Sequence, residues 1–141
     1  MAAATSIMRA QQIVLSAVDG ALKPLGLTFA RWEALVLLSF SRTGALPLGK
    51  IGERLMVHPA SITNTIDRLE EAGLVTRIPH DQDSRITLAS ITRKGRALAQ
   101  RATHAVEAVE FGLEPLNNAE LKKVTEIIRH LRAGKGEFRE Q

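Results

Sequence analysis

Short hydrogen-bonding side chains cluster at the start of one segment, residues 58–74, which reads HPASITNTIDRLEEAGL. Ser61, Thr63 and Asn64 are interleaved with apolar residues at the spacing of a buried helical stripe: Ile62, Ile66 and Leu69. Hydroxyl and amide side chains compete for backbone hydrogen bonds and are neutral or poor helix formers. A merely solvated face would more favourably use Glu, Lys, Gln or Ala. The pattern therefore predicts a helix face that contacts a flat, hydrogen-bonding surface.

These side chains have the chemistry of DNA recognition. The hydroxyls of Ser61 and Thr63 can hydrogen-bond phosphates or base edges, and Asn64 can pair in bidentate fashion with adenine. Arg68, one helical turn later, can reach a phosphate or a guanine. Alternatively, the two hydroxyls satisfy the first turn of their own helix, and the residues alone leave both interpretations open.

A second candidate contact lies in the polar segment HDQDSR, residues 80–85. An arginine at the tip of a hairpin can enter the narrow minor groove of DNA, where the potential is most negative. Arg85 has this position, and Asp83 is spaced to hold its guanidinium group through a charge-assisted hydrogen bond. The alternative is an ordinary exposed ion pair between the same two residues.

The positive charge of the chain is concentrated around these candidates. The 141 residues carry a net charge of +4 at pH 7. Residues 42–101 hold ten basic and six acidic side chains, whereas the rest of the chain holds nine of each. A localised basic surface is typical of proteins that bind a polyanion, although a solvated surface of mixed charge would give the same count.

The flanking sequence predicts the elements that must position these residues. We expect a helix over residues 4–22 that KPLG ends, a second helix capped by Thr28, and a short third helix over about 48–56. The polar helix then begins at Pro59 and ends at Gly73. SRTGALP reads as a connection, and LVTRI and ITLASIT read as a two-stranded hairpin around the polar loop.

Two more helices follow. Thr92 can cap a long helix over residues 93–112, and Asn117 with Glu120 has the spacing of a helix cap. The last helix carries an apolar stripe of Leu121, Val124, Ile128 and Leu131, followed by a polar tail expected to fray. The apolar stripes of the first helix and of the last two helices exceed what one small core can absorb, so we expect a two-fold dimer.

Two short helices joined by a three-residue turn and followed by a hairpin have the order of a winged helix-turn-helix. In that fold the second helix enters the major groove, with its N-terminal residues nearest the base edges. The sequence therefore predicts a mainly α fold with a small β-hairpin wing, which binds double-stranded DNA.

The segments LTFARWEALVLL, LGKIGERLMVHPASITNTIDRLEEAGLVTR, and DSR followed by ASITRKG resemble the multiple-antibiotic-resistance regulator (MarR) family. The likeness spans about residues 25–100, and the flanking helices fit the family layout. The resemblance implies a homodimeric repressor of a palindromic operator, released by a small, frequently aromatic or phenolic, ligand. By position it assigns Ser61, Thr63, Asn64 and Arg68 to the recognition helix, and Asp83 and Arg85 to the wing.

The family layout treats residues 1–141 as a single domain. It implies dimerisation helices at about 1–25 and 112–141, a winged helix-turn-helix at about 28–92, and a connecting helix at 93–112. Two positions depart from the family pattern. Ser84 stands where family wings often have Arg, and Asn64 stands where the recognition helix often has Arg, so the operator sequence cannot be borrowed from relatives.

The composition argues against other classes of protein. The absence of cysteine excludes disulfides, cysteine-ligated zinc and thiol-based peroxide sensing. No phosphate-binding glycine loop occurs, and no metal-ligand spacing joins the four histidines, His58, His80, His104 and His130. We therefore expect no catalytic site, metal or cofactor. No segment resembles a signal peptide or a span of ~18 apolar residues, which predicts a cytoplasmic protein without a membrane partner.

The sequence does not identify the ligand-binding residues. Trp32, on a strongly apolar helix, is interpreted as a core residue in preference to a pocket residue. A pocket like that of the family would lie among the first, second and fifth helices, near Trp32 and Arg31. A winged helix that contacts only proteins, and a constitutive DNA-binding protein without an effector, remain the alternatives to a ligand-responsive repressor.

Overall fold

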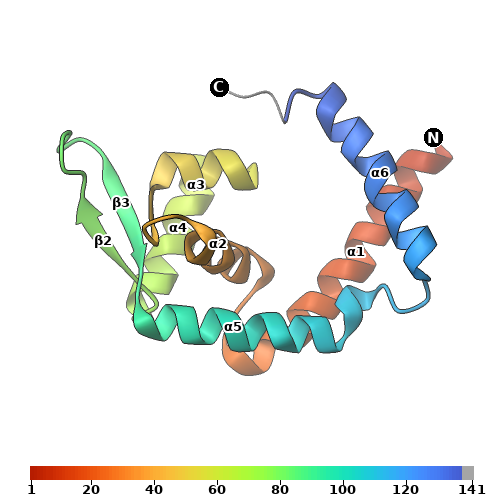
Figure 1. The fold of residues 1–141 in the computed structure, drawn as a ribbon, viewed down its shortest axis with the longest axis horizontal. Coiled ribbons are helices and arrows are strands. Elements are labelled where there is room, and N and C mark those ends of the chain that lie inside the picture. Colours follow the sequence, from red (N-terminus) through yellow and green to blue (C-terminus); the bar gives the residue numbers. More distant parts are fainter. Residues whose placement is uncertain (138–141) are drawn as a thin grey trace.

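The computed structural model describes residues 1–137, which form a winged helix at one end of a long helix and two further helices at the other end (Figure 1). In chain order the elements are α1 (Ala2–Leu22), η1 (Lys23–Leu25), α2 (Phe29–Phe40), β1 (Ala45–Pro47), α3 (Leu48–Leu55), α4 (Pro59–Glu71), β2 (Val75–Pro79), β3 (Thr87–Ile91), α5 (Arg93–Ala108), η2 (Glu110–Gly112) and α6 (Asn118–Gly134). The long helix α5 runs between the wing and the end of the molecule where α1 and α6 lie (Figure 1). The predicted mainly α fold with a small β wing is confirmed.

The helix ends follow the capping residues that the sequence predicted. The side chain of Thr28 accepts a hydrogen bond from the first turn of α2. Pro59 takes the first position of α4, and Gly73 follows that helix with φ of +73°. Asn117 and Glu120 form a reciprocal capping box at the start of α6. These signals are local, so the surrounding fold does not override them.

The sheet has three strands in the order β1–β3–β2, so the predicted two-stranded hairpin was incomplete. The segment interpreted as a connection contains β1, which pairs antiparallel with β3 in the register Ala45–Ser90. With only three residues, β1 is too short to show the alternation that marks a strand. It is also an edge strand, which explains why it tolerates Pro47, whose missing N–H group would interrupt a central ladder.

The helix predicted over residues 93–112 ends earlier, at Ala108. Glu110 and Phe111 have φ of +51° and +57°, and this left-handed backbone turns the chain. The turn brings the ring of Phe111 to 6.1 Å from that of Trp32. Gly112 lies so close to α1 that a Cβ atom there would be 2.8 Å from the Cβ atom of Ala17. Packing against α1 and α2 therefore ends the helix, which no local sequence signal indicates.

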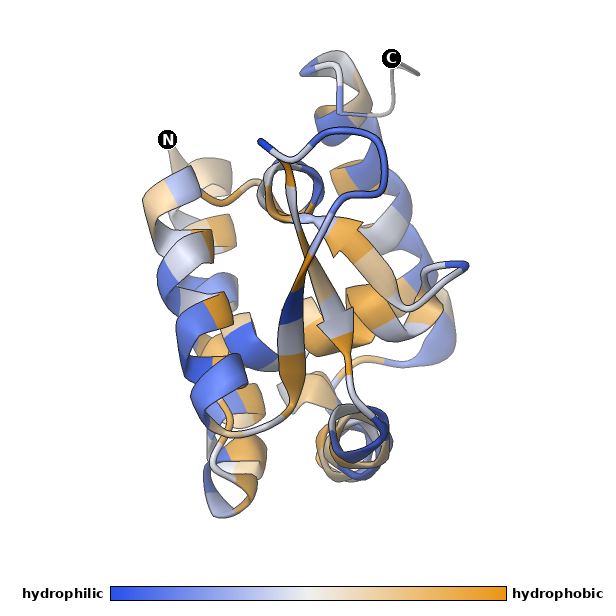
Figure 2. Cartoon of the chain, turned by 90° about the vertical axis from the view of Figure 1, so that its left-hand side faces the viewer, coloured by the Kyte–Doolittle hydropathy of each residue, from blue (hydrophilic) through white to orange (hydrophobic). Residues whose placement is uncertain are grey.

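One hydrophobic core lies beneath the winged helix. It takes Ile62, Ile66 and Leu69 from α4, together with residues of α2, the sheet and α5. The C-terminal half of α1 joins this core through Val18 and Leu22, whereas Ile13 is 61% exposed. Hydrophilic and hydrophobic residues alternate along the helices, as expected for elements with one buried face (Figure 2). Helix α6 differs, because none of its residues is buried.

Candidate nucleic-acid interface

The predicted recognition helix, α4, presents its polar residues to solvent. Ile62, Ile66 and Leu69 are at most 3% exposed, and they fix the rotation of the helix against the core. On the opposite side lie the exposed residues Ser61, Thr63, Asn64 and Arg68. The structure thus brings together on one accessible face the four helix residues that the sequence predicted.

The four predicted contact residues of α4 differ in their hydrogen bonds. The hydroxyl of Thr63 donates to the carbonyl oxygen of Pro59 at 3.0 Å, so this hydroxyl serves its own helix, which was the alternative interpretation. Within residues 1–137, the side chains of Ser61 and Asn64 make no hydrogen bond. Arg68 contacts Glu71 at 3.4 Å, a long and exposed ion pair. Ser61, Asn64 and Arg68 are therefore available to an external partner at little cost.

The wing loop holds the predicted pair of Asp83 and Arg85. Arg85 donates from Nε to Oδ1 at 3.0 Å and from Nη2 to Oδ2 at 2.9 Å, and its backbone N–H group also donates to Oδ1 at 3.0 Å. The side-chain and backbone hydrogen bonds from Arg85 lower the pKa of Asp83, and the same carboxylate raises the pKa of Arg85. The predicted contact is therefore present. The Arg85 side chain remains 88% exposed, held by a bidentate carboxylate but open to solvent.

A third arginine, Arg77 on β2, joins the wing to α4. Its guanidinium group donates to Asp67 at 2.5 Å and to Glu70 at 2.8 Å, and its backbone N–H group donates to Glu70 at 2.9 Å. The backbone and side-chain hydrogen bonds from Arg77 lower the pKa of Glu70. Sequence reasoning missed this link. Asp67 and Glu70 share a helix face by their i, i+3 spacing, but nothing local pairs them with a strand residue.

The start of α5 holds the end of α4. The hydroxyl of Thr92 donates to the carbonyl oxygen of Gly73 at 2.8 Å, and Lys94 donates to that of Ala72 at 2.9 Å. Gly95 lies against the carbonyl of Leu74, where a Cβ atom would be only 2.1 Å from the oxygen. Helix α4 is therefore fixed at its C-terminal end to the long helix as well as to the wing.

A cavity of about 370 Å³ lies between α2 and α5. Its walls include Trp32, Phe40 and Arg96, and the remaining lining residues are Val36, Ser39, Ala99, Gln100, Thr103, His104 and Glu107. The indole Nε1 group of Trp32 donates to the hydroxyl of Thr103 at 3.1 Å. Trp32 is thus partly a core residue and partly a pocket residue. The lining residues of this cavity come from α2 and α5 and include Arg96, whereas the pocket expected among the first, second and fifth helices, near Trp32 and Arg31, stays a prediction.

Comparison with known proteins finds a matching family model, related sequences and similar solved structures. A model of the MarR family matches residues 27–87. The HTH-type transcriptional repressor Rv2887 of Mycobacterium tuberculosis is 32% identical over 104 residues, covering 74% of this chain and 73% of that protein. The crystal structure of Sco5413, a MarR family transcriptional regulator from Streptomyces coelicolor, is 54% identical with a TM-score of 0.93, covering 99% and 97% of the two chains. The chain belongs to the MarR family of transcriptional regulators.

Another solved relative has a ligand. CouR from Rhodococcus jostii RHA1, bound to p-coumaroyl-CoA, is 27% identical to this MarR-family chain with a TM-score of 0.79, covering 96% and 91% of the two chains. The predicted resemblance to the family is therefore confirmed, and with it the assignment to DNA-binding transcription regulators.

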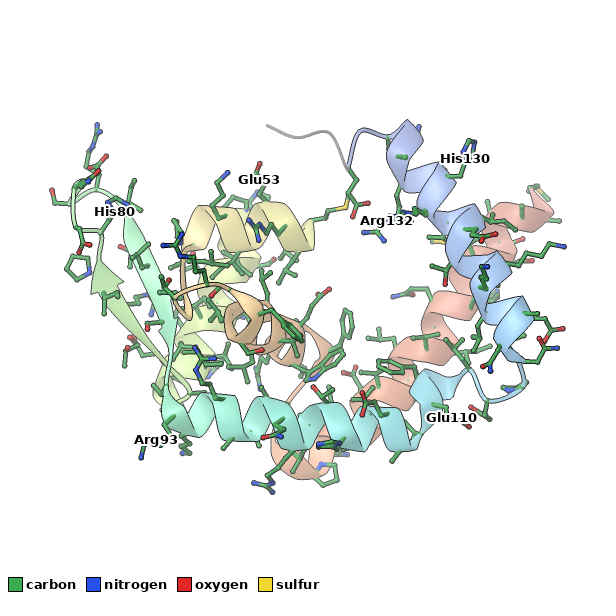
Figure 3. All side chains as sticks on the ribbon, viewed as in Figure 1. Glu53, His80, Arg93, Glu110, His130 and Arg132 are labelled. Carbon is green, nitrogen blue, oxygen red and sulfur yellow. The ribbon has the colours of Figure 1, made fainter. Side chains whose placement is uncertain are left out.

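Two of the four histidines lie far apart in the fold. His80 lies on the wing loop and His130 on α6, at opposite ends of this MarR-family chain (Figure 3). Residues 1–137 contain no group of three or more His, Asp or Glu side chains that could hold a metal ion. In the same range no single helix has the length and apolar character needed to cross a membrane; α1 and α2 reach that threshold only together, across a 78° bend.

Proposed function

We propose that this protein is a homodimeric repressor that reads a palindromic operator with α4 and the wing and leaves it when a small aromatic ligand binds. The observation that carries the DNA-binding role is the exposed polar face of α4, together with an arginine that a carboxylate holds in the wing loop. Both features face solvent, and both carry hydrogen-bond donors that can bind phosphate oxygens and the acceptors on base edges. A regulator of this kind acts in the cytoplasm, where bacterial DNA is found.

Each proposed contact residue has a distinct role. Asn64 pairs with adenine in the major groove, since both of its polar groups are unoccupied. Ser61 contacts the phosphate backbone or a base edge. The hydroxyl of Thr63 donates to its own helix, and its oxygen lone pairs accept a hydrogen bond from the DNA. Arg68 contacts a phosphate or a guanine after leaving Glu71. Arg85, oriented by Asp83, enters the adjacent minor groove.

The exposed apolar residues of α1 and α6 support the proposed dimer. Ile127 and Leu131 on α6 are 59% and 49% exposed, and Ile7 and Ile13 on α1 are 43% and 61% exposed. Side chains of this size are normally buried, and a two-fold partner offers the same faces in return. In such a dimer the two recognition helices lie about 34 Å apart, one turn of DNA, so that they fit successive major grooves.

The cavity between α2 and α5 is the proposed effector site. Its apolar walls suit an aromatic ring, and Arg96 supplies a cation for a carboxylate or phenolate. The bound p-coumaroyl group of CouR is an aromatic acyl ligand in a related protein. The cavity is bounded by α5, whose first residues hold the end of α4, so a ligand that moves α5 also moves the recognition helix.

The test begins with genomic fragments selected by the purified protein, which give the operator and its neighbouring genes. Titration of phenolic and aryl-carboxylate compounds against the operator complex then tests release. With ~2 kcal/mol of coupling, an effector would weaken operator binding about thirty-fold. Selective binding to palindromic fragments that no compound weakens would leave a constitutive DNA-binding protein. Absence of any DNA binding would leave a winged helix that contacts other proteins.

A further inference from the structure

The side chain of His80 organises the wing loop from within. Its Nδ1 atom accepts hydrogen bonds from the backbone N–H groups of Gln82 at 3.1 Å and Asp83 at 3.2 Å. A side chain that accepts from the backbone two and three residues later is the usual arrangement of Asp, Asn, Ser or Thr in turns. Here an imidazole takes that role. Figure 3 labels His80 on this loop, between β2 and β3.

The backbone of the same residues closes the loop. The N–H group of His80 donates to the carbonyl oxygen of Ile86 at 3.1 Å, and the N–H group of Ile86 donates to that of Asp83 at 3.1 Å. Both polar backbone groups of Asp83 are therefore fixed, one by His80 and one by Ile86. Because the backbone of Asp83 is fixed, its carboxylate can hold a partner side chain in one orientation.

That partner is the exposed arginine of the wing. Asp83 binds Arg85 through two side-chain hydrogen bonds and one backbone hydrogen bond. Arg85 itself is 88% exposed, and its only hydrogen bonds within residues 1–137 are these three to Asp83. Its direction thus depends on Asp83, and the position of Asp83 depends in turn on His80.

We propose that His80 is a positioning residue for DNA binding, which orients Arg85 toward the minor groove through Asp83. The inference rests on the proposed role of Arg85 in DNA binding. It requires an unprotonated Nδ1 atom, so the ring proton is on Nε2, since a protonated Nδ1 could not accept from the two backbone N–H groups. What His80 contributes is an acceptor at a fixed point, and an asparagine oxygen can supply the same acceptor.

The test compares His80→Ala with His80→Asn, alone and combined with Arg85→Ala, by fluorescence anisotropy on the selected operator. We expect His80→Ala to weaken binding about five- to ten-fold, and His80→Asn to stay within about two-fold of the unchanged protein. Arg85→Ala should cost about ten-fold in the unchanged protein and less than about two-fold in the His80→Ala background, because its partner is already misplaced. Gln82→Ala is the matched control, since it removes a loop side chain but keeps the backbone donor.

Two further measurements separate positioning from folding. Circular dichroism and light scattering should show the same helix content and assembly in all variants, because the loop lies outside the core. Nitrogen NMR of the imidazole should report an unprotonated Nδ1 atom in the free protein. A protonated Nδ1 atom overturns the proposal.

The operator titrations distinguish failure of this proposal from failure of the proposed function. If Arg85→Ala does not weaken operator binding at all, the role of the wing in the proposed function is wrong, and the positioning role fails with it. If Arg85→Ala costs the same factor with and without His80, only the positioning role is overturned. The positioning role is also overturned if His80→Asn binds as weakly as His80→Ala, which would indicate a direct contact through the imidazole.

Discussion

The winged-helix half of the molecule and the α6 end differ in how completely they bury their apolar residues. Ile66 in the winged helix is 0% exposed, and the core around it is closed by α2, the sheet and α5. On α6 the corresponding apolar stripe stays open, with Val124 47%, Ile127 59% and Leu131 49% exposed. Burial of apolar surface is the main favourable contribution to folding. One chain therefore closes the core of the winged helix, whereas the apolar face of α6 stays exposed.

The two halves also differ in what fixes their polar groups. In the winged helix, Arg77 links two acidic residues of α4 to β2, and the start of α5 holds the end of α4. These links join one element of the winged helix to another. On α6 the capping box of Asn117 and Glu120 is local to the helix. Substitutions in the winged helix should therefore alter stability or DNA binding whether the protein is a monomer or a dimer. Substitutions on α6 should act by disrupting the proposed dimer.

The largest expected effect comes from apolar residues in the two halves. Ile66→Ala should lower the free energy of unfolding by about 2–5 kcal/mol at any protein concentration, because it leaves a cavity in a closed core. Ile127→Glu should leave the winged helix folded but convert the proposed dimer to monomers, so that its unfolding midpoint no longer depends on concentration. Denaturation at two concentrations together with light scattering checks both. A stable monomer of the unchanged protein at micromolar concentration would contradict the comparison.

The next largest effect is expected on operator affinity, from substitutions that leave the oligomeric state unchanged. Asn64→Ala should cost about 1–3 kcal/mol on the preferred operator and relax base preference at one position in each half-site. Arg68→Ala should weaken binding more evenly across sequences if its partner is a phosphate. Competition binding with operator and random DNA measures the difference. Equal losses on both DNAs for Asn64→Ala would show that this residue does not read a base.

A smaller effect is expected from the link between α4 and β2. Arg77→Ala should lower the free energy of unfolding by about 1 kcal/mol, because its side chain is only 26% exposed and makes two charge-assisted hydrogen bonds. Arg68→Ala is the matched control, since its single ion pair is 3.4 Å long and exposed, and should change stability by less than about 0.5 kcal/mol. Urea denaturation measures both. A smaller loss for Arg77→Ala than for Arg68→Ala would show that the link adds nothing.

The smallest effect is the pH dependence of the same link. The hydrogen bonds from Arg77 lower the pKa of Glu70 below its ordinary value of 4.5. A lowered carboxyl pKa stabilises the fold above the ordinary value, and this contribution is lost as the pH falls through the folded-state pKa. The stability difference between the unchanged protein and Glu70→Gln should therefore be present at pH 7 and be smaller at a pH below 4.5. Denaturation at the two pH values checks this, with Glu71→Gln as the control that should show little change at either.

The exposure and pairing of the residues predicted for DNA binding could be predicted because their environment is set locally. The apolar spacing of α4 fixes which side is buried, so the exposure of Ser61, Asn64 and Arg68 follows from the sequence. Asp83 and Arg85 are two residues apart, close enough for one loop to pair them. His80 could not be assigned its role, because an imidazole in place of the usual Asp or Asn gives no turn signal.

The sequence by itself determined the helices, their caps and the order of a winged helix-turn-helix, since apolar periodicity and capping act over a few residues. The tertiary structure decided what depends on distant partners. Strand β1 exists because β3 pairs with it, α5 ends where Phe111 meets Trp32, and Arg77 finds its carboxylates across two elements. The cavity with Arg96 exists only once α2 lies against α5. Such contacts join residues on different elements, and no pattern within one element encodes them.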